Sequence, residues 1–132
     1  MDKIKIIEFL KQNELSNIEE INYKENTVVV RFTYEFDDLE VEAAKAYAND
    51  ESEDEEEGAI WYEEFFYPYL SDLAIDNVGE ILEELMESKN IDAQFVSYEI
   101  DEEDYGYNEF IAVFTSKETE VDIEQVLEEL NL

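Results

Sequence analysis

The excess of acidic side chains is the property that most restricts how this chain can fold. Its 132 residues include 39 Asp and Glu but only 8 Lys and Arg, a formal net charge of -31. Like charges at this density destabilise a compact state, so the carboxylates must remain in water while other side chains form the core. Hydrophobic residues make up 45% of the chain and aromatic residues 14%. Disordered acidic chains are poor in such residues, and we therefore expect a folded domain.

Composition also excludes several classes of function. The chain has no Cys and no His, which removes disulfides, thiol nucleophiles and the commonest general base and metal ligand. Three Gly leave no phosphate-binding loop, and a single Arg leaves no anion clamp. We therefore expect a protein that is not an enzyme and that needs no cofactor.

The expected location follows from the apolar segments. The first residues lack the apolar core of a signal peptide. No apolar run approaches the roughly 20 residues that cross a bilayer. We expect a cytoplasmic protein that does not bind membranes.

Apolar periodicity predicts a single domain over residues 1–132, built from two αββα-like halves. In the first half we expect a helix over residues 3–12 and a hairpin of strands 18–23 and 27–36. Asp37 is expected to cap a second helix, with Glu40 completing a capping box. We expect this second helix to pack through Leu39, Ala43 and Tyr47.

The second half follows an acidic segment, 49–58, that is predicted to be a flexible loop because its like charges repel. An aromatic segment after it is expected to form a short helix that Pro68 ends. The remaining elements are predicted to be a helix from Asp76 to about Lys89, strands 93–100 and 108–115, and a last helix with Ile123, Val126, Leu127 and Leu130 on its apolar face.

These elements predict an α+β fold, in which a four-stranded antiparallel sheet of two hairpins has helices on one face. The halves also align with each other. A constant offset pairs Leu10 with Leu85 and Tyr23 with Tyr98, and a longer turn then pairs Val30 with Ile111. The alignment ends by pairing Ala43, Ala44 and Tyr47 with Val126, Leu127 and Leu130. An internal duplication and two units that share ordinary patterning account for this match equally well.

The charge is concentrated in one part of the sequence. Residues 1–36 contain 5 basic and 7 acidic residues, whereas residues 37–132 contain 3 basic and 32 acidic residues. Some of the acidic residues recur on one side of two predicted helices, and a surface with several such rows approaches the one charge per about 1.7 Å of duplex DNA. Such a surface repels nucleic acid and anionic membranes and attracts basic proteins. It predicts a nucleic-acid mimic, or an immunity-type protein that neutralises a toxin or nuclease.

Aromatic residues lie next to the acidic segment, and Tyr and Trp are frequent anchors in protein interfaces. The alternative is that these rings cover an open end of the sheet. On the first interpretation, the candidate partner-binding residues are Asp50, Glu51, Glu53, Asp54, Glu55, Glu56, Glu57, Trp61, Tyr62, Glu80, Glu83, Glu84, Glu87 and Tyr105.

A second possible function is divalent-cation binding. Residues 53–64 approach the frame of a calcium loop, with Gly58 at the sharp turn and Glu64 at the bidentate position. The candidate ligands are Glu53, Glu55, Glu57 and Glu64. The fit is poor because the first positions of such loops normally use the shorter Asp and Asn. A third possibility is a structural domain with no ligand.

Overall fold

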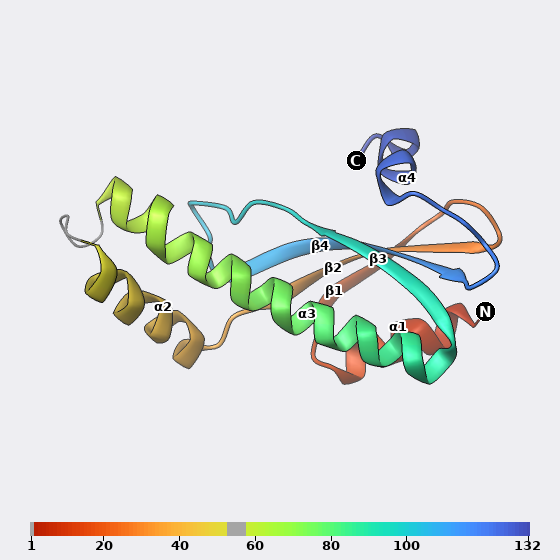
Figure 1. Ribbon diagram of the computed structural model, residues 1–132, viewed down its shortest axis with the longest axis horizontal. Coiled ribbons are helices and arrows are strands. Elements are labelled where there is room, and N and C mark those ends of the chain that lie inside the picture. Colours follow the sequence, from red (N-terminus) through yellow and green to blue (C-terminus); the bar gives the residue numbers. More distant parts are fainter. Residues whose placement is uncertain (1, 53–57) are drawn as a thin grey trace.

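The fold is that of a computed structural model, which describes residues 2–52 and 58–132. A four-stranded antiparallel sheet forms its centre, with the strand order β1-β2-β4-β3 (Figure 1). The strands are β1 (Ser16–Ile21), β2 (Thr27–Glu35), β3 (Ile91–Ser97) and β4 (Tyr107–Ser116). The expected α+β fold with two antiparallel hairpins is confirmed.

The two hairpins join through the central strands β2 and β4. These strands pair along their whole length, from Thr27 opposite Thr115 to Glu35 opposite Tyr107. Side chains alternate across the sheet, so Phe32 and Phe110 lie on one face, with their rings stacked 5.6 Å apart. Both faces of the central strands are apolar and must be covered.

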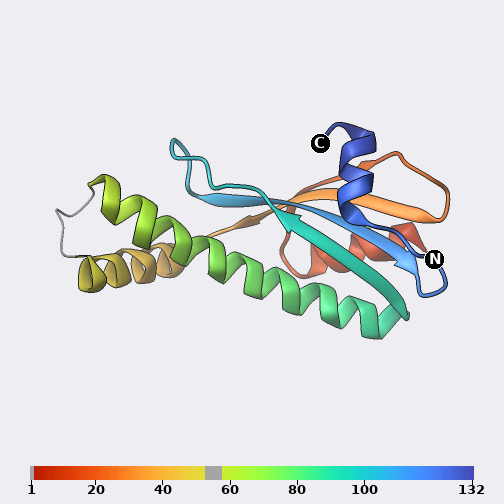
Figure 2. The ribbon, with the colours of Figure 1, turned by 45° about the horizontal axis from the view of Figure 1, so that its top comes forward.

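Helices cover both faces of the sheet, whereas the sequence predicted helices on one face. α1 (Lys3–Gln12) and α3 (Tyr67–Lys89) pack against the face that carries Phe32 and Phe110. α4 (Ile123–Leu130) lies on the opposite face, as Figure 2 shows. The physical reason is that one helical layer would leave the second apolar face in water; α4 covers part of that face by packing Ile123 and Val126 against Val29, Ile111 and Val113.

α3 is one long helix, and two predictions about this region are wrong. A π-helical turn, η1 (Trp61–Phe66), leads directly into α3, so Pro68 lies in the first turn of α3 and Asp76 lies inside it. At the junction the N–H of Tyr67 donates to the carbonyl of Tyr62, five residues back. A proline has no N–H to donate, and its ring crowds the preceding turn of an α-helix. The wider π turn accommodates the ring, and the helix continues.

α2 (Asp38–Glu51) begins as the sequence predicts. The Asp37 carboxylate accepts the N–H of Glu40 at 2.8 Å, and the Glu40 carboxylate accepts the N–H of Asp37 at 3.0 Å. Its packing face differs from the prediction, because the small residues Ala44 and Ala48 are buried and allow α2 to approach the aromatic side chains of η1 closely. The predicted face, Leu39, Ala43 and Tyr47, is exposed.

α2, η1 and the first half of α3 form a helical hairpin, which we call the arm, that extends beyond the sheet (Figure 1). Asn49, Asp50 and Glu51 belong to α2, so the helix includes the start of the predicted 49–58 loop. Residues 53–57 of that loop lie outside the described residues. The arm has its own core, formed by Ala44, Ala48, Trp61, Phe66 and Leu70.

The structure overturns part of the alignment between the two halves. Val30 faces α1 and α3, whereas Ile111, its partner in the alignment, faces α4. The second helices also differ, because α2 packs in the arm and α4 packs on the sheet. The segments α1-β1-β2 and α3-β3-β4 nonetheless each supply a helix on the same face, an outer strand and a central strand. A duplication remains a prediction for these segments.

Candidate functional site

The aromatic segment forms the inside of the arm. Trp61 is 1% exposed, its ring stacks 5.0 Å from that of Phe66, and its indole N–H donates to Asn49 at 2.9 Å. The structure thus buries Trp61, which the sequence predicted on a partner-binding surface, in the core of the arm. Tyr62 is half-buried, and its ring edge contacts Trp61 at 4.8 Å.

Tyr105 joins the arm to the hairpin loop between β3 and β4. Its half-buried ring meets that of Phe66 edge-on at 5.0 Å, and Ile100 packs in the same cluster. The sequence did not anticipate that this loop closes the arm core. The aromatic residues therefore fix the direction of the arm relative to the sheet.

A series of hydrogen-bonded side chains at the base of the arm also fixes its direction relative to the sheet. The Tyr34 hydroxyl of β2 donates to the Glu40 carboxylate at 2.6 Å and accepts from the Asn77 amide at 2.8 Å. Burial and the hydrogen bond to Glu40 raise the pKa of Tyr34 to about 12. These three side chains connect β2, α2 and α3.

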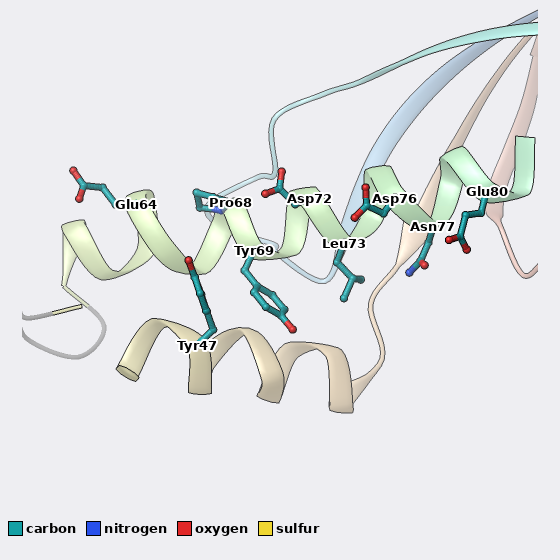
Figure 3. A pocket seen from close by; sticks show the side chains of 9 residues that line it. All are labelled: Tyr47, Glu64, Pro68, Tyr69, Asp72, Leu73, Asp76, Asn77 and Glu80. Carbon is teal, nitrogen blue, oxygen red and sulfur yellow. The ribbon is translucent and has the colours of Figure 1, made fainter. Parts of the chain in front are cut away.

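An open groove of about 580 Å³ runs between α2 and α3 on the surface of the arm (Figure 3). We call it the arm groove. Tyr47 points from α2 toward α3, and Tyr69 and Leu73 point back from α3 (Figure 3). The Tyr47 and Tyr69 rings lie 5.2 Å apart. Tyr47, Tyr69, Leu73 and Pro68 supply the apolar part of the lining, and the acidic residues that line the groove are Glu64, Asp72, Asp76 and Glu80.

A row of carboxylates continues from the groove along α3. Asp72, Asp76, Glu80, Glu83 and Glu87 are all exposed, and we call them the α3 stripe. Their spacing of three or four residues keeps them on one side of a helix, opposite the buried Ala74, Val78 and Leu82. The sequence identified only the second half of this row, because it placed Asp72 and Asp76 outside or at the edge of the predicted helix.

No member of the stripe forms an ion pair in the described part of the chain. Among residues 2–52 and 58–132, the ion pairs join Lys3 to Glu20 and Arg31 to Glu109, and neither pair includes a residue of α3. The exposed carboxylates of the stripe therefore repel one another and attract cations from solution.

A second acidic recess of about 380 Å³ lies on the other side of α3, beside the β3–β4 loop. Glu63, Tyr67, Glu99 and Glu102 are among the residues that line it. Burial, and next the negative charge of Glu102, raises the pKa of Tyr67. The start of α3 thus carries negative charge on both sides.

The remaining predicted site residues are not gathered into one place. Asp50 and Glu51 lie exposed at the end of α2, and Glu84 is exposed on α3 beside the stripe. Glu53, Asp54, Glu55, Glu56 and Glu57 lie outside the described residues. Of the predicted residues that the structure describes, Glu80, Glu83 and Glu87 lie together in the α3 stripe. Asp72 and Asp76, which the sequence did not predict, complete that stripe.

The predicted metal centre lies mostly outside the described residues. Of the four candidate ligands only Glu64 is described, and it is exposed at the end of the arm groove. No cluster of three or more Asp and Glu suited to holding a metal ion occurs in the described part of the chain. The helices of that part also lack a segment long and apolar enough to cross a membrane.

No protein family model matches this chain, and no curated protein or solved structure is significantly similar to it.

Proposed function

We propose that this protein binds a basic protein through the carboxylates of α3 and occludes the cationic surface of that partner. The observation that carries the proposal is the α3 stripe: five exposed carboxylates that take part in neither ion pair of the described residues, on a helix that two cores hold in place. A small domain needs a net charge of only about 2–8 in magnitude for solubility. The formal charge of -31 far exceeds that need.

The regular repetition of charge along the stripe supports a partner that normally binds a polyanion. Successive members lie three or four residues apart, or about 4.5–6 Å along the helix axis. This spacing is wider than the one phosphate per about 3.4 Å of a single DNA strand, so the stripe shares the linear order of a polyanion at a lower charge density. A nucleic-acid-binding protein or a nuclease-type toxin presents the complementary cations. Such an interaction is non-enzymatic inhibition by occupancy of the partner's cleft.

The test compares two variants with equal charge changes. Asp72→Asn, Asp76→Asn and Glu80→Gln together neutralise part of the stripe. The control, Glu118→Gln, Glu120→Gln and Glu128→Gln, neutralises three exposed carboxylates in the C-terminal part of the chain. Each protein is immobilised, exposed to cell lysate at low salt and eluted with rising salt, and the retained proteins are identified by mass spectrometry.

The wild type and the control are expected to retain the same basic proteins and to release them between about 50 and 500 mM salt, because screening weakens charge attraction. The stripe variant should release them at clearly lower salt. Equal retention by all three proteins, or binding that salt leaves unchanged, would contradict the proposal.

A further inference from the structure

The unpartnered apolar edge of α2 is the starting point. Leu39 is 76% exposed and Tyr47 is 41% exposed, and Ala43 between them is exposed as well. These residues lie four positions apart and so follow one edge of the helix. Single exposed apolar residues need no explanation, but Tyr47 belongs both to this row and to the lining of the arm groove. We call the row and the apolar lining residues together the apolar strip.

The strip has the dimensions of a helix-binding site. The lining residues extend along α3 from Glu64 to Glu80, which corresponds to about 24 Å, or a little more than four turns of helix. α2 and α3 are two packed helices whose shared groove is open to solvent (Figure 3). A third helix laid in such a groove buries apolar side chains against both, as in other helix-in-groove complexes.

The charges select the kind of helix. Asp72, Asp76 and Glu80 line the groove at intervals of four residues. Lys or Arg at intervals of four on a roughly parallel partner helix have the same axial rise of about 6 Å. An Arg beside the apolar strip would also meet the Tyr47 and Tyr69 rings, which suit cation–π contact. A second copy of this chain is a poor occupant, because both copies carry the same charge of -31.

The geometry points to an amphipathic basic α-helix of the partner as the occupant of the arm groove. Its apolar side would contact Leu39, Tyr47 and Leu73, and its basic side would face the carboxylates of α3. This inference rests on the proposed function and adds the secondary structure and the apolar contacts of the bound segment.

The test uses two synthetic peptides of identical composition. Each has about 18 residues, with equal numbers of Leu, Ala and Lys. In the first, Leu and Lys occupy opposite sides of a helix; in the second, the order is scrambled so that neither forms a side. Binding is measured by fluorescence anisotropy at low salt and by NMR shifts in the protein. We expect the amphipathic peptide to bind at least about tenfold more tightly and to shift the amides around Ala43 and Leu73.

A matched pair of variants tests the apolar contact. Leu39→Gln removes an exposed aliphatic side chain beside the groove, and Ile4→Gln removes one that is 68% exposed on α1. Neither changes the net charge. Leu39→Gln should lower the affinity for the amphipathic peptide several-fold and leave the affinity for the scrambled peptide unchanged. Ile4→Gln should change neither affinity.

The outcomes separate the two proposals. Equal affinities of the two peptides, with loss of both in the stripe variant, would overturn the helix assignment and leave charge-driven binding in place. Failure of both peptides to bind, together with no salt-eluted basic protein in the lysate experiment, would overturn both proposals. Sedimentation that finds a dimer dissociated by Leu39→Gln would replace the partner helix with a second copy.

Discussion

Trp61 is a central residue of the arm core, since its ring stacks on Phe66 and its N–H is satisfied by Asn49. We expect Trp61→Ala to lower the free energy of unfolding by about 3–5 kcal/mol, as for other large-to-small core substitutions. Urea unfolding followed by circular dichroism measures this without the lost fluorophore. The exposed neighbour Ile60 provides the control, and Ile60→Ala should cost no more than about 0.5 kcal/mol. Equal losses would contradict the buried position of Trp61.

Tyr34 gives the stability a dependence on alkaline pH. Its pKa is about 12 in the folded protein, against about 10 for an unfolded tyrosine. Between these values the unfolded chain releases a proton that the folded protein retains, so this contribution to stability is complete below pH 10 and is lost as the pH rises toward 12.

Tyr34→Phe removes this ionisation. The free energy of unfolding, measured from about pH 9 to 11.5, should therefore fall less steeply in the variant than in the wild type. Identical slopes would show that burial and Glu40 do not hold the proton on Tyr34.

At the scale of elements, the π turn explains how η1 buries two residues that are five apart. In an α-helix, five residues turn through about 500°, which puts Trp61 and Phe66 about 140° apart. The π turn winds more slowly, and the two rings stack with their planes only 14° apart.

Deletion of Glu63, which is exposed in the π turn, should convert η1 into regular α-helix, since Trp61 and Phe66 would then be four residues apart and on one face. We expect this deletion to retain the fold. A deletion of Glu83 should unfold α3, because it rotates Leu85 out of the core. Thermal unfolding followed by circular dichroism compares the two deletion variants. A similar loss of stability in both would contradict the interpretation that the π turn arises from one residue inserted into an α-helix.

The sequence predicted the elements whose signals are local. The periodicity of α1 and α4 and the Asp37–Glu40 capping box needed no knowledge of the neighbours. The errors arose where tertiary packing overrides a local rule. Pro68 is accepted because the preceding turn is wide, and α2 packs through alanines because close approach to η1 outweighs the burial of Leu39.

Part of the candidate site could be predicted, because that part depends on local spacing alone. The Glu80, Glu83 and Glu87 row follows from helical spacing alone. Asp72 and Asp76 join it only because α3 is continuous through that region. The arm groove depends on how α2 and α3 pack, and no spacing within one helix contains that information.

For the whole molecule, the uncompensated charge implies that salt stabilises the fold. Repulsion within the α3 stripe is screened as ionic strength rises, so the melting temperature should increase between about 20 and 500 mM NaCl. The stripe variant with Asp72, Asp76 and Glu80 neutralised should be more stable than the wild type at low salt, by about 1 kcal/mol. The difference should shrink at high salt. A less stable variant at every salt concentration would contradict this account of the stripe.

The strand order also determines when the protein can fold during synthesis. β2 needs β4 beside it, yet the two are separated in sequence by the arm, the second half of α3 and β3. Until residues up to Ser116 have left the ribosome, β2 has an unpaired edge, and the face that α4 covers stays open until residues 123–130 follow. The arm, whose helices are close in sequence, can form earlier, because closing a short loop costs less entropy. Completion of the sheet is therefore the late step in the biosynthesis of this domain.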